Sequence, residues 1–402
     1  MWLAILGSAL VCAVIAVIYL VNRFGHFAVV SRLAGNRRWL RILVSCVPVL
    51  CLFVYGIFNI VNSVIIVLHL AAFWLIADLA TGLFSFLRRR FSRKTPDAGA
   101  AAEAPADTAD ASENGPCGNT ASPKIYWKGI VVLTLCAVYL AIGMYNAYHV
   151  DRTAYELTTD KELPGGKLRI AHIADSHIGT TFGGEGFAEY LKKIEAEKPG
   201  VLVFTGDFVD DGTTREEMVA ACRAFAGIQI TYGIFFCFGN HDKGYYSNRG
   251  YTAEDIVAEL TANGVTVLED ETVLVADTFY ITGRMDRSDS ERAKDGRARL
   301  PMEELTKDLD KSRYMIVLDH QPNDYAAESA AGADLVLSGH THGGQLIPLG
   351  PIGRLMGAND RTYGTETRGN TTFIVTSGIS DWEILFKTGT KSEYVIIDIT
   401  RR

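Results

Sequence analysis

Residues 333–345 read ADLVLSGHTHGGQ, an apolar run of strand character followed directly by a glycine-rich turn that holds His340 and His342. Two imidazoles two residues apart converge on one point when the backbone curls, and imidazoles are common metal ligands. A lone motif of this kind fits a polar surface turn equally well. The rest of the chain must therefore decide between a metal site and a turn.

Four other apolar runs end in polar clusters in the same way. The clusters are Asp175 and His177 after KLRIAHIA, Asp207 and Asp210 after VLVFT, Asn240 and His241 after YGIFFCF, and His320 after YMIVLD. Helical spacing of apolar residues at 186–197, 214–226 and 252–263 alternates with these runs, which predicts an α/β domain with a largely parallel core. Because the carboxyl ends of strands in open α/β sheets line one crevice, we expect all five clusters to meet there.

The side chains gathered at these strand ends are those of a divalent metal centre. The remaining four histidines, which we expect to be structural, are His26, His69, His149 and His172. Imidazole, carboxylate and amide ligands without cysteine favour Mn²⁺, Fe²⁺ or Zn²⁺. With His241 set aside, the candidate metal ligands are Asp175, His177, Asp207, Asn240, His320, His340 and His342. Seven ligands are too many for one ion and suit two that share a bridging carboxylate.

The first 150 residues predict a helical membrane bundle. We expect three transmembrane helices within 1–94, a flexible linker at 95–123 and a fourth transmembrane helix at 124–150, ahead of the α/β domain at 165–402. The first span covers 2–21. The next two share an apolar stretch too long for one helix, which predicts a turn at the polar residues 59–63.

Basic residues in the loops predict the orientation of the bundle. They flank two of the three loops, at Arg23, Arg32, Arg37, Arg38 and Arg41, at Arg88, Arg89, Arg90, Arg93 and Lys94, and at Lys124 and Lys128. Because Lys and Arg in short loops stay in the cytoplasm, we expect a multi-pass protein of the cell membrane with its α/β domain on the extracytoplasmic side. For the ionisable Asp78 of the third span, a partner inside the bundle is favoured over an ion path.

The order of the motifs DSH, GDFVD, GNHD, DHQP and GHTH across 175–342 resembles the calcineurin-like metallophosphoesterase superfamily, and GHTHGGQ behind a membrane-anchored half resembles its bacterial membrane branch. The resemblance implies a four-layer α/β/β/α sandwich. It also implies that Asp175, His177 and His342 hold one ion, that Asn240, His320 and His340 hold the other, and that Asp207 bridges them. His241 matches the catalytic, non-ligand histidine of the family, and Asp210 the carboxylate that orients it.

The function implied is a membrane-anchored phosphoesterase with two divalent ions, in which a metal-bridging hydroxide attacks phosphorus and His241 protonates the leaving oxygen. Substrates would be phosphodiesters, phosphomonoesters or pyrophosphates, including lipid- or cell-envelope-linked ones. Where many protein phosphatases of the superfamily read GDxxDRG, this chain has Asp211 before Gly212, which disfavours protein phosphatase activity. The alternatives are a non-catalytic membrane sensor or binding protein, which would not need His241 as an acid, and a transporter.

The remaining features concern partners and specificity. A net charge of −7 argues against a nucleic-acid partner, and nothing in the sequence requires a protein partner. The highly charged stretch 284–299 predicts a solvated loop or a lid. The glycine-rich stretch 348–370 follows the histidine turn, so one of Arg354, Arg361 and Arg368 is expected to contact a substrate phosphate.

Overall fold

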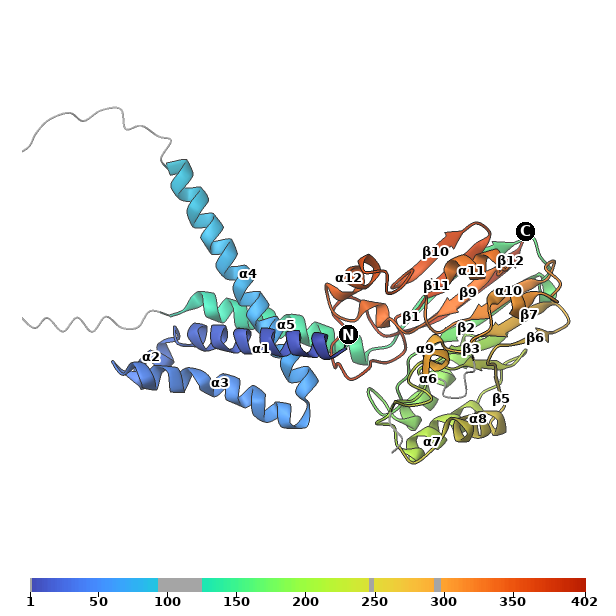
Figure 1. Cartoon of the computed structure of the whole chain (residues 1–402), viewed down its shortest axis with the longest axis horizontal. Coiled ribbons are helices and arrows are strands. Elements are labelled where there is room, and N and C mark those ends of the chain that lie inside the picture. The colour runs from blue at the N-terminus through green and yellow to red at the C-terminus, as the bar shows by residue number, and fades with distance from the viewer. Residues whose placement is uncertain (1, 93–124, 246–248, 293–297) are drawn as a thin grey trace, which may run out of the picture. The chain divides into compact units, whose positions relative to one another are not determined.

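The computed structural model describes residues 2–92, 125–245, 249–292 and 298–402. The predicted linker at 95–123 lies outside these residues. The chain forms two compact units, Met1–Tyr139 and Leu140–Arg402. Figure 1 shows that the first unit is helical and that the second combines strands and helices.

The helices of the first unit contain the apolar stretches of the sequence. They are α1 (Trp2–Phe24), α2 (Ala28–Ala34), α3 (Arg38–Phe58), α4 (Ile60–Ser92) and the first part of α5 (Trp127–Tyr148). Helices α3, α4 and α5 are each long and apolar enough to cross a membrane, and the pair α1 and α2, bent by 79°, would make a fourth span. The predicted turn between the second and third spans occurs at Asn59, whose side chain caps the start of α4 by accepting from the Asn62 backbone. The count of four spans stays a prediction.

Asp78 of α4 has its partners inside the bundle, as the sequence suggested. Its carboxylate forms ion pairs with Arg23 of α1 and Lys128 of α5, and it accepts a hydrogen bond from the Tyr19 hydroxyl. A charge buried among apolar helices needs such partners. Asp78 therefore joins three helices of the bundle.

Two six-stranded sheets form the centre of the second unit. The first has the order β1 (Asp151–Thr159), β12 (Glu393–Arg401), β2 (Lys167–Ile173), β3 (Val201–Thr205), β4 (Ile234–Cys237) and β5 (Val265–Val267). The second has the order β10 (Gly364–Arg368), β11 (Thr371–Val375), β9 (Leu335–Ser338), β8 (Tyr314–Leu318), β7 (Phe279–Gly283) and β6 (Glu271–Val275). Among these twelve described strands, β12–β2, β10–β11 and β6–β7 pair antiparallel, and the other neighbours pair parallel. The five sequence-predicted strands are divided between two sheets, not gathered in one.

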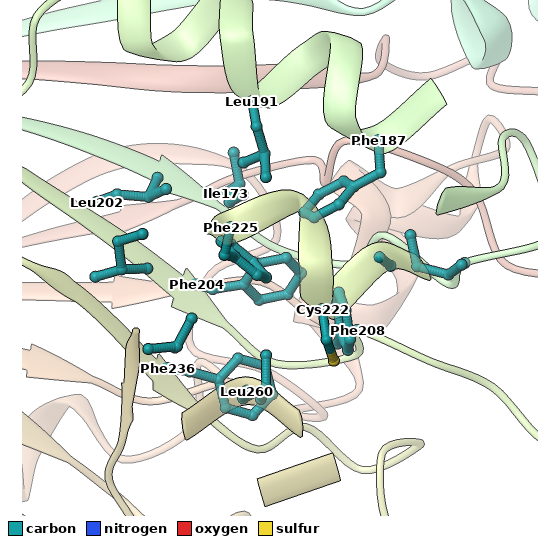
Figure 2. Close-up of a cluster of buried hydrophobic side chains, with 14 of the residues drawn as sticks. Ile173, Phe187, Leu191, Leu202, Phe204, Phe208, Cys222, Phe225, Phe236 and Leu260 are labelled. Carbon is teal, nitrogen blue, oxygen red and sulfur yellow. The ribbon is translucent and has the colours of Figure 1, made fainter. Parts of the chain in front are cut away.

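Three apolar layers hold the sheets and helices together. Helices α6 (Gly184–Ala196), α7 (Arg215–Phe225) and α8 (Ala253–Ala262) cover the outer face of the first sheet, where Phe187, Phe204 and Phe225 pack in one cluster (Figure 2). A second cluster, including Ile170 and Ile316, lies between the sheets. A third joins the second sheet to α10 (Met302–Thr306) and α11 (Tyr325–Ala330). This arrangement confirms the four-layer α/β/β/α sandwich.

Two of the outer helices begin with side-chain caps. The Thr214 side chain accepts a hydrogen bond from the Glu217 backbone at the start of α7, and Thr252 and Asp255 form a capping box at the start of α8. Such caps satisfy backbone donors that a helix leaves unpaired. The helices thus begin close to where the sequence predicts them.

The last turns of α5 belong to the second unit and are hydrogen-bonded to the segment that precedes β12. The Lys387 backbone donates to the Gly143 carbonyl at 2.9 Å, and the Asn146 side chain donates to the Lys387 carbonyl at 3.1 Å. The Ser392 hydroxyl donates to the Ala147 carbonyl at 2.8 Å. These bonds fix the last turns of α5, which belong to the second unit, to residues 387–392.

Candidate metal centre

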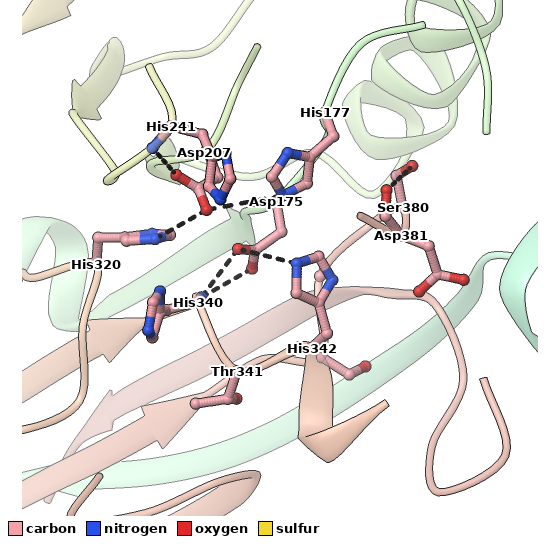
Figure 3. A network of polar contacts seen from close by, with 12 residues as sticks. Asp175, His177, Asp207, His241, His320, His340, Thr341, His342, Ser380 and Asp381 are labelled. Carbon is pink, nitrogen blue, oxygen red and sulfur yellow. Dashed lines mark hydrogen bonds and ion pairs between the residues drawn. The ribbon is translucent and has the colours of Figure 1, made fainter. Parts of the chain in front are cut away.

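Six of the seven predicted ligands are seen together in Figure 3, at the carboxyl ends of strands from both sheets. One group consists of Asp175 and His177 after β2 and His342 after β9, and a second consists of Asp207 after β3, His320 after β8 and His340 after β9. In each group one potential ligand atom per residue lies within 4.8 Å of the others. Asn240 joins the second group, since its side-chain oxygen is 3.1 Å from Nε2 of His320.

Asp207 lies between the two groups. Its Oδ2 atom is 3.1 Å from Nε2 of His320 and 3.6 Å from Nε2 of His177. Its Oδ1 atom accepts a hydrogen bond from the His241 backbone at 2.9 Å, which fixes the plane of the carboxylate. One oxygen of Asp207 thus faces both groups of candidate ligands.

Several nitrogen atoms at the centre are buried without a hydrogen bond. Both ring nitrogens of His177 and Nδ1 of His342 find no hydrogen-bond partner among the residues that the structure describes. Buried polar atoms of a folded protein are nearly always paired, so an unpaired cluster requires an explanation. A bound cation supplies one, because neutral imidazole nitrogens and carboxylates are its usual ligands.

The backbone is strained where these side chains project. Five of the candidate ligands have a left-handed φ that side-chain-bearing residues rarely adopt: Asp175 at 54°, His177 at 36°, Asp207 at 55°, His340 at 71° and His342 at 47°. Each such residue costs on the order of 1–3 kcal/mol and persists only where the surrounding structure enforces it. Strain concentrated at one rim marks a functional site.

The charges of the centre favour the binding of a metal cation. Burial alone would lower the pKa of His320, but Asp207, Asp175 and Asp286 hold it well above its ordinary value. Burial lowers the pKa of His340 to about 3 and that of His342 well below its ordinary value, so both imidazoles are neutral. The carboxylates thus provide negative potential while His340 and His342 keep a lone pair for a metal.

His320 is oriented by a backbone contact. Its Nδ1 atom is 2.8 Å from the Thr205 carbonyl, and since a carbonyl only accepts, Nδ1 carries the proton. Nε2 then points at Asn240 and Asp207. A second hydrogen bond of this kind is typical of histidines that bind metals.

His241 and Asp210 lie beside the two ligand groups and form a third group with His177, whose Nδ1 atom is 3.5 Å from Oδ2 of Asp210. Nδ1 of His241 is 3.1 Å from Oδ1 of Asp210, and the His241 ring packs near Trp382 with centroids 5.3 Å apart. Burial opposes protonation of His241, but Asp207 and Asp210 raise its pKa to about 9. Burial likewise raises the pKa of Asp210, but its contacts with His177 and His241 bring it below its ordinary value. His241 is therefore a cation near neutral pH, held in place by Asp210.

Two glycines allow the strand ends to approach the candidate ligands. A Cβ atom on Gly339 would lie 2.4 Å from Oδ2 of Asp175, and one on Gly239 would lie 2.3 Å from Oδ1 of Asp207. No side chain fits at those distances. The two glycines thus let the backbone approach the carboxylates of Asp175 and Asp207 closely.

Asp242 is a part of the centre to which sequence reasoning gave no role. Its buried carboxylate accepts hydrogen bonds from the backbones of Asp207, Phe208, Val209 and Gly239 at 2.7–3.1 Å. It therefore ties the loop after β3 to the loop after β4. Its position in the GNHD motif was the feature of the sequence that could have identified it as part of the centre.

A second missed feature is the shoulder segment, which we define as residues 376–392. Its Ser380 backbone donates to the Asp175 carbonyl at 3.2 Å, and its Thr390 hydroxyl donates to the His342 carbonyl at 3.1 Å. Inside it, the fully buried Lys387 pairs with Asp381 at 3.2 Å and donates to the carbonyls of Ser377 and Ser380. A buried lysine was unexpected from sequence because Lys is rarely buried.

The interpretation of 284–299 as a solvated loop or lid is wrong for its two ends. Arg284 is 2% exposed and pairs with Asp319 at 3.0 Å and Asp324 at 2.8 Å, and Arg299 also pairs with Asp319. Charged residues enter the interior when such partners compensate their desolvation. Residues 287–292 form helix α9, and 293–297 lie outside the described residues.

The three arginines of 348–370 differ in their contacts. Arg361 pairs with Glu366, and Arg368 pairs with Glu366 and Asp360. Arg354 is exposed and forms no ion pair within the described parts of the chain. Contact of any of them with substrate stays a prediction.

Comparison with known proteins agrees with this geometry. Residues 168–344 match the model of the calcineurin-like phosphoesterase family. An uncharacterized metallophosphoesterase of Aquifex aeolicus is 32% identical over 229 residues, which cover 56% of this chain and 83% of that protein. The chain belongs to the calcineurin-like phosphoesterase family. As a metallophosphoesterase it is a metal-dependent hydrolase of phosphoric esters.

Two further relatives are also similar in sequence to this metallophosphoesterase. An uncharacterized metallophosphoesterase of Campylobacter jejuni is 27% identical over 278 residues, covering 68% of this chain and 70% of that protein. A transmembrane protein with a metallophosphoesterase domain from Danio rerio is 25% identical over 241 residues, covering 56% of this chain and 52% of its own length. The apolar helices α3 to α5 indicate that this metallophosphoesterase is itself a membrane protein.

Proposed function

We propose that this metallophosphoesterase holds two divalent cations, Mn²⁺, Fe²⁺ or Zn²⁺, and hydrolyses phosphoester or pyrophosphate bonds. Asp175, His177 and His342 would hold one cation, and Asn240, His320 and His340 the other. The observation that carries the proposal is the position of Asp207, because one of its oxygens faces His177 of the first group and His320 of the second. Such a shared carboxylate is typical of paired metal sites.

When bound, two cations polarise the phosphoryl group and supply a nucleophile at neutral pH. The chain's own residues then perform two tasks. The ligand side chains would hold the cations at the common rim of β2, β3, β4, β8 and β9 and so determine where the ester binds. His241, a cation below about pH 9, donates its Nε2 proton to the leaving oxygen, while Asp210 at 3.1 Å keeps Nδ1 protonated and the ring oriented.

We infer that the substrates are esters presented at a membrane, such as phosphodiesters, phosphomonoesters or pyrophosphates linked to lipids or to the cell envelope. The direct fixation of α5 to residues 387–392 supports this, since that segment also contacts the candidate ligand loops. The Danio rerio relative is likewise named as a transmembrane protein. A catalytic centre attached in this way samples ester bonds near the bilayer more often than those in bulk solution.

We further propose that the catalytic domain lies on the extracytoplasmic side. The basic residues that flank the first and third loops support this orientation, and so does the charge-free second loop at 59–63. An even number of spans then places both the amino terminus and the domain outside.

The test is hydrolysis by the full chain in detergent micelles, in Mn²⁺ and after chelation, with an alkyl and an aryl phosphodiester, a phosphomonoester and a pyrophosphate ester as substrates. We expect turnover that requires the metal and is lost in Asp207→Asn. The matched control is His149→Ala, which removes an exposed histidine placed outside the metal centre. Metal-loaded protein that hydrolyses no mono-, di- or pyrophosphate ester would contradict the proposal and favour a binding protein.

A further inference from the structure

The chain carries an unusually apolar surface segment next to the metal centre, which we call the apolar segment and define as residues 347–356, IPLGPIGRLM. It contains helix α12 (Leu349–Leu355), which leads into β10 (Figure 1). Its large side chains project outward: Ile347, Leu349 and Ile352 are 42–58% exposed, Met356 is 78% exposed and Leu355 is 88% exposed. Contiguous exposed apolar side chains mark a contact surface, whereas single ones do not.

The charge of this segment is equally unusual. Arg354 is its only charged residue, and acidic residues do not occur between Gln345 and Ala358. Arg354 is exposed and forms no ion pair among the residues described by the structure. Apolar side chains together with an unpaired basic one are typical of segments that lie in the interface of a bilayer with anionic headgroups.

The apolar segment is joined to the end of a candidate membrane span. The Ile347 backbone donates to the Thr388 hydroxyl at 3.1 Å, and the next residue back, Lys387, donates to the Gly143 carbonyl of α5. Gly143 lies about 8 Å before the end of α5 along the helix axis. Residues 387–389 thus connect the segment to the part of α5 that reaches the membrane surface, since α5 is long and apolar enough to cross a bilayer.

From this continuity we propose that the apolar segment inserts into the interfacial layer of the bilayer, with Arg354 at the phosphates of anionic lipids. The occupant is the membrane itself, not a second copy of the chain. Because the segment starts two residues after Gln345 and five after His342, its insertion holds the metal turn against the membrane surface. The inference does not depend on which esters are cleaved.

The test is photo-cross-linking of the full chain in nanodiscs of phosphatidylethanolamine and phosphatidylglycerol. A benzophenone amino acid replaces Leu355 in one variant and Met356 in another. The control variant carries it at Leu274, which is 43% exposed on β6, at the opposite edge of the second sheet from β10. We expect phospholipid adducts by mass spectrometry at 355 and 356 and none above background at 274.

Three outcomes would overturn the proposal: no lipid adduct at either position, equal adducts at 274, or adducts only with a second protein chain. Both test positions point outward, so replacement leaves the core intact, and either variant is sufficient if the other does not accumulate. Arg354→Gln in the 355 variant should reduce the adduct yield with phosphatidylglycerol more than with phosphatidylethanolamine alone. Because cross-linking needs no turnover, failure here is distinct from failure of the proposed catalysis.

Discussion

His241 is placed to act on the leaving group, and its role depends on how much that group needs a proton. Replacing it with Ala removes a general acid, which contributes roughly 10²–10⁴-fold to the rate. We expect His241→Ala to keep its bound metal, since the ring lies outside both ligand groups, and to lose most of kcat on alkyl phosphodiesters. Nitrophenyl esters, whose leaving groups need no proton, should lose much less. Unchanged turnover of the alkyl esters would remove His241 from this role.

Asp210 sets the pH range over which His241 can act. The pKa of His241 is raised to about 9, so the acid is protonated below that pH and activity falls as pH rises through it. Asp210→Asn removes one of the charges that raise this pKa. We therefore expect the alkaline limb of kcat on alkyl esters to move to lower pH in Asp210→Asn. A limb at the same pH in both proteins would show that another group titrates there.

At the scale of residues, the sequence indicated the seven candidate ligands because each directly follows an apolar run or lies within a dense motif. It gave no role to Asp242, whose partners are four backbone amides that become neighbours only in the fold. It also missed the buried pair of Lys387 and Asp381, since neither lies in a motif and their partners become neighbours only when residues 376–392 fold.

Glycines in the turns after the strands determine whether the ligands converge. In Gly339→Ala the new Cβ atom would meet the Asp175 carboxylate at 2.4 Å, so the turn after β9 or the carboxylate must move. We expect loss of bound metal and of activity, with the domain still folded. Metal analysis and circular dichroism would measure this. Gly353→Ala in α12, where nothing lies within 4 Å of the new atom, is the matched control.

The stability of the shoulder segment depends on Lys387. Its removal leaves Asp381 buried without a countercharge and the carbonyls of Ser377 and Ser380 without this donor, which typically costs about 3–5 kcal/mol. We expect Lys387→Ala to unfold at a clearly lower temperature by calorimetry. Lys391→Ala, at a half-exposed lysine of the same segment, should change the free energy of unfolding by less than about 1 kcal/mol. Equal Tm values for the two variants would contradict the role of Lys387.

At the scale of elements, apolar strands with a polar cluster at their ends were predictable, and edge strands were not. β1 reads DRTAYELTT and alternates half-buried with exposed residues, while β10 reads GTETR and carries no aliphatic residue. Neither has the continuous apolar character of the central strands, because one face of each meets solvent. The division into two sheets came from resemblance to a family, since local patterns do not encode pairing.

The orientation of the whole molecule follows from its loops. If the basic loops are cytoplasmic, an alkaline phosphatase reporter fused after residue 150 should be active and one fused within 95–123 should be inactive. A green fluorescent protein fused within 95–123 should fluoresce, and one fused after residue 150 should not. Activity of the phosphatase fused within 95–123 would place the catalytic domain in the cytoplasm instead.

The most direct test of a centre that binds two metal ions is the metal content of the purified full chain. If Asp207 is shared by two groups of ligands, the wild-type chain should bind about two divalent ions by plasma mass spectrometry. Asp207→Asn should lose at least one of them, while the control His149→Ala keeps both. Two ions retained in Asp207→Asn, or none in the wild-type chain after incubation with Mn²⁺, Fe²⁺ and Zn²⁺, would contradict it.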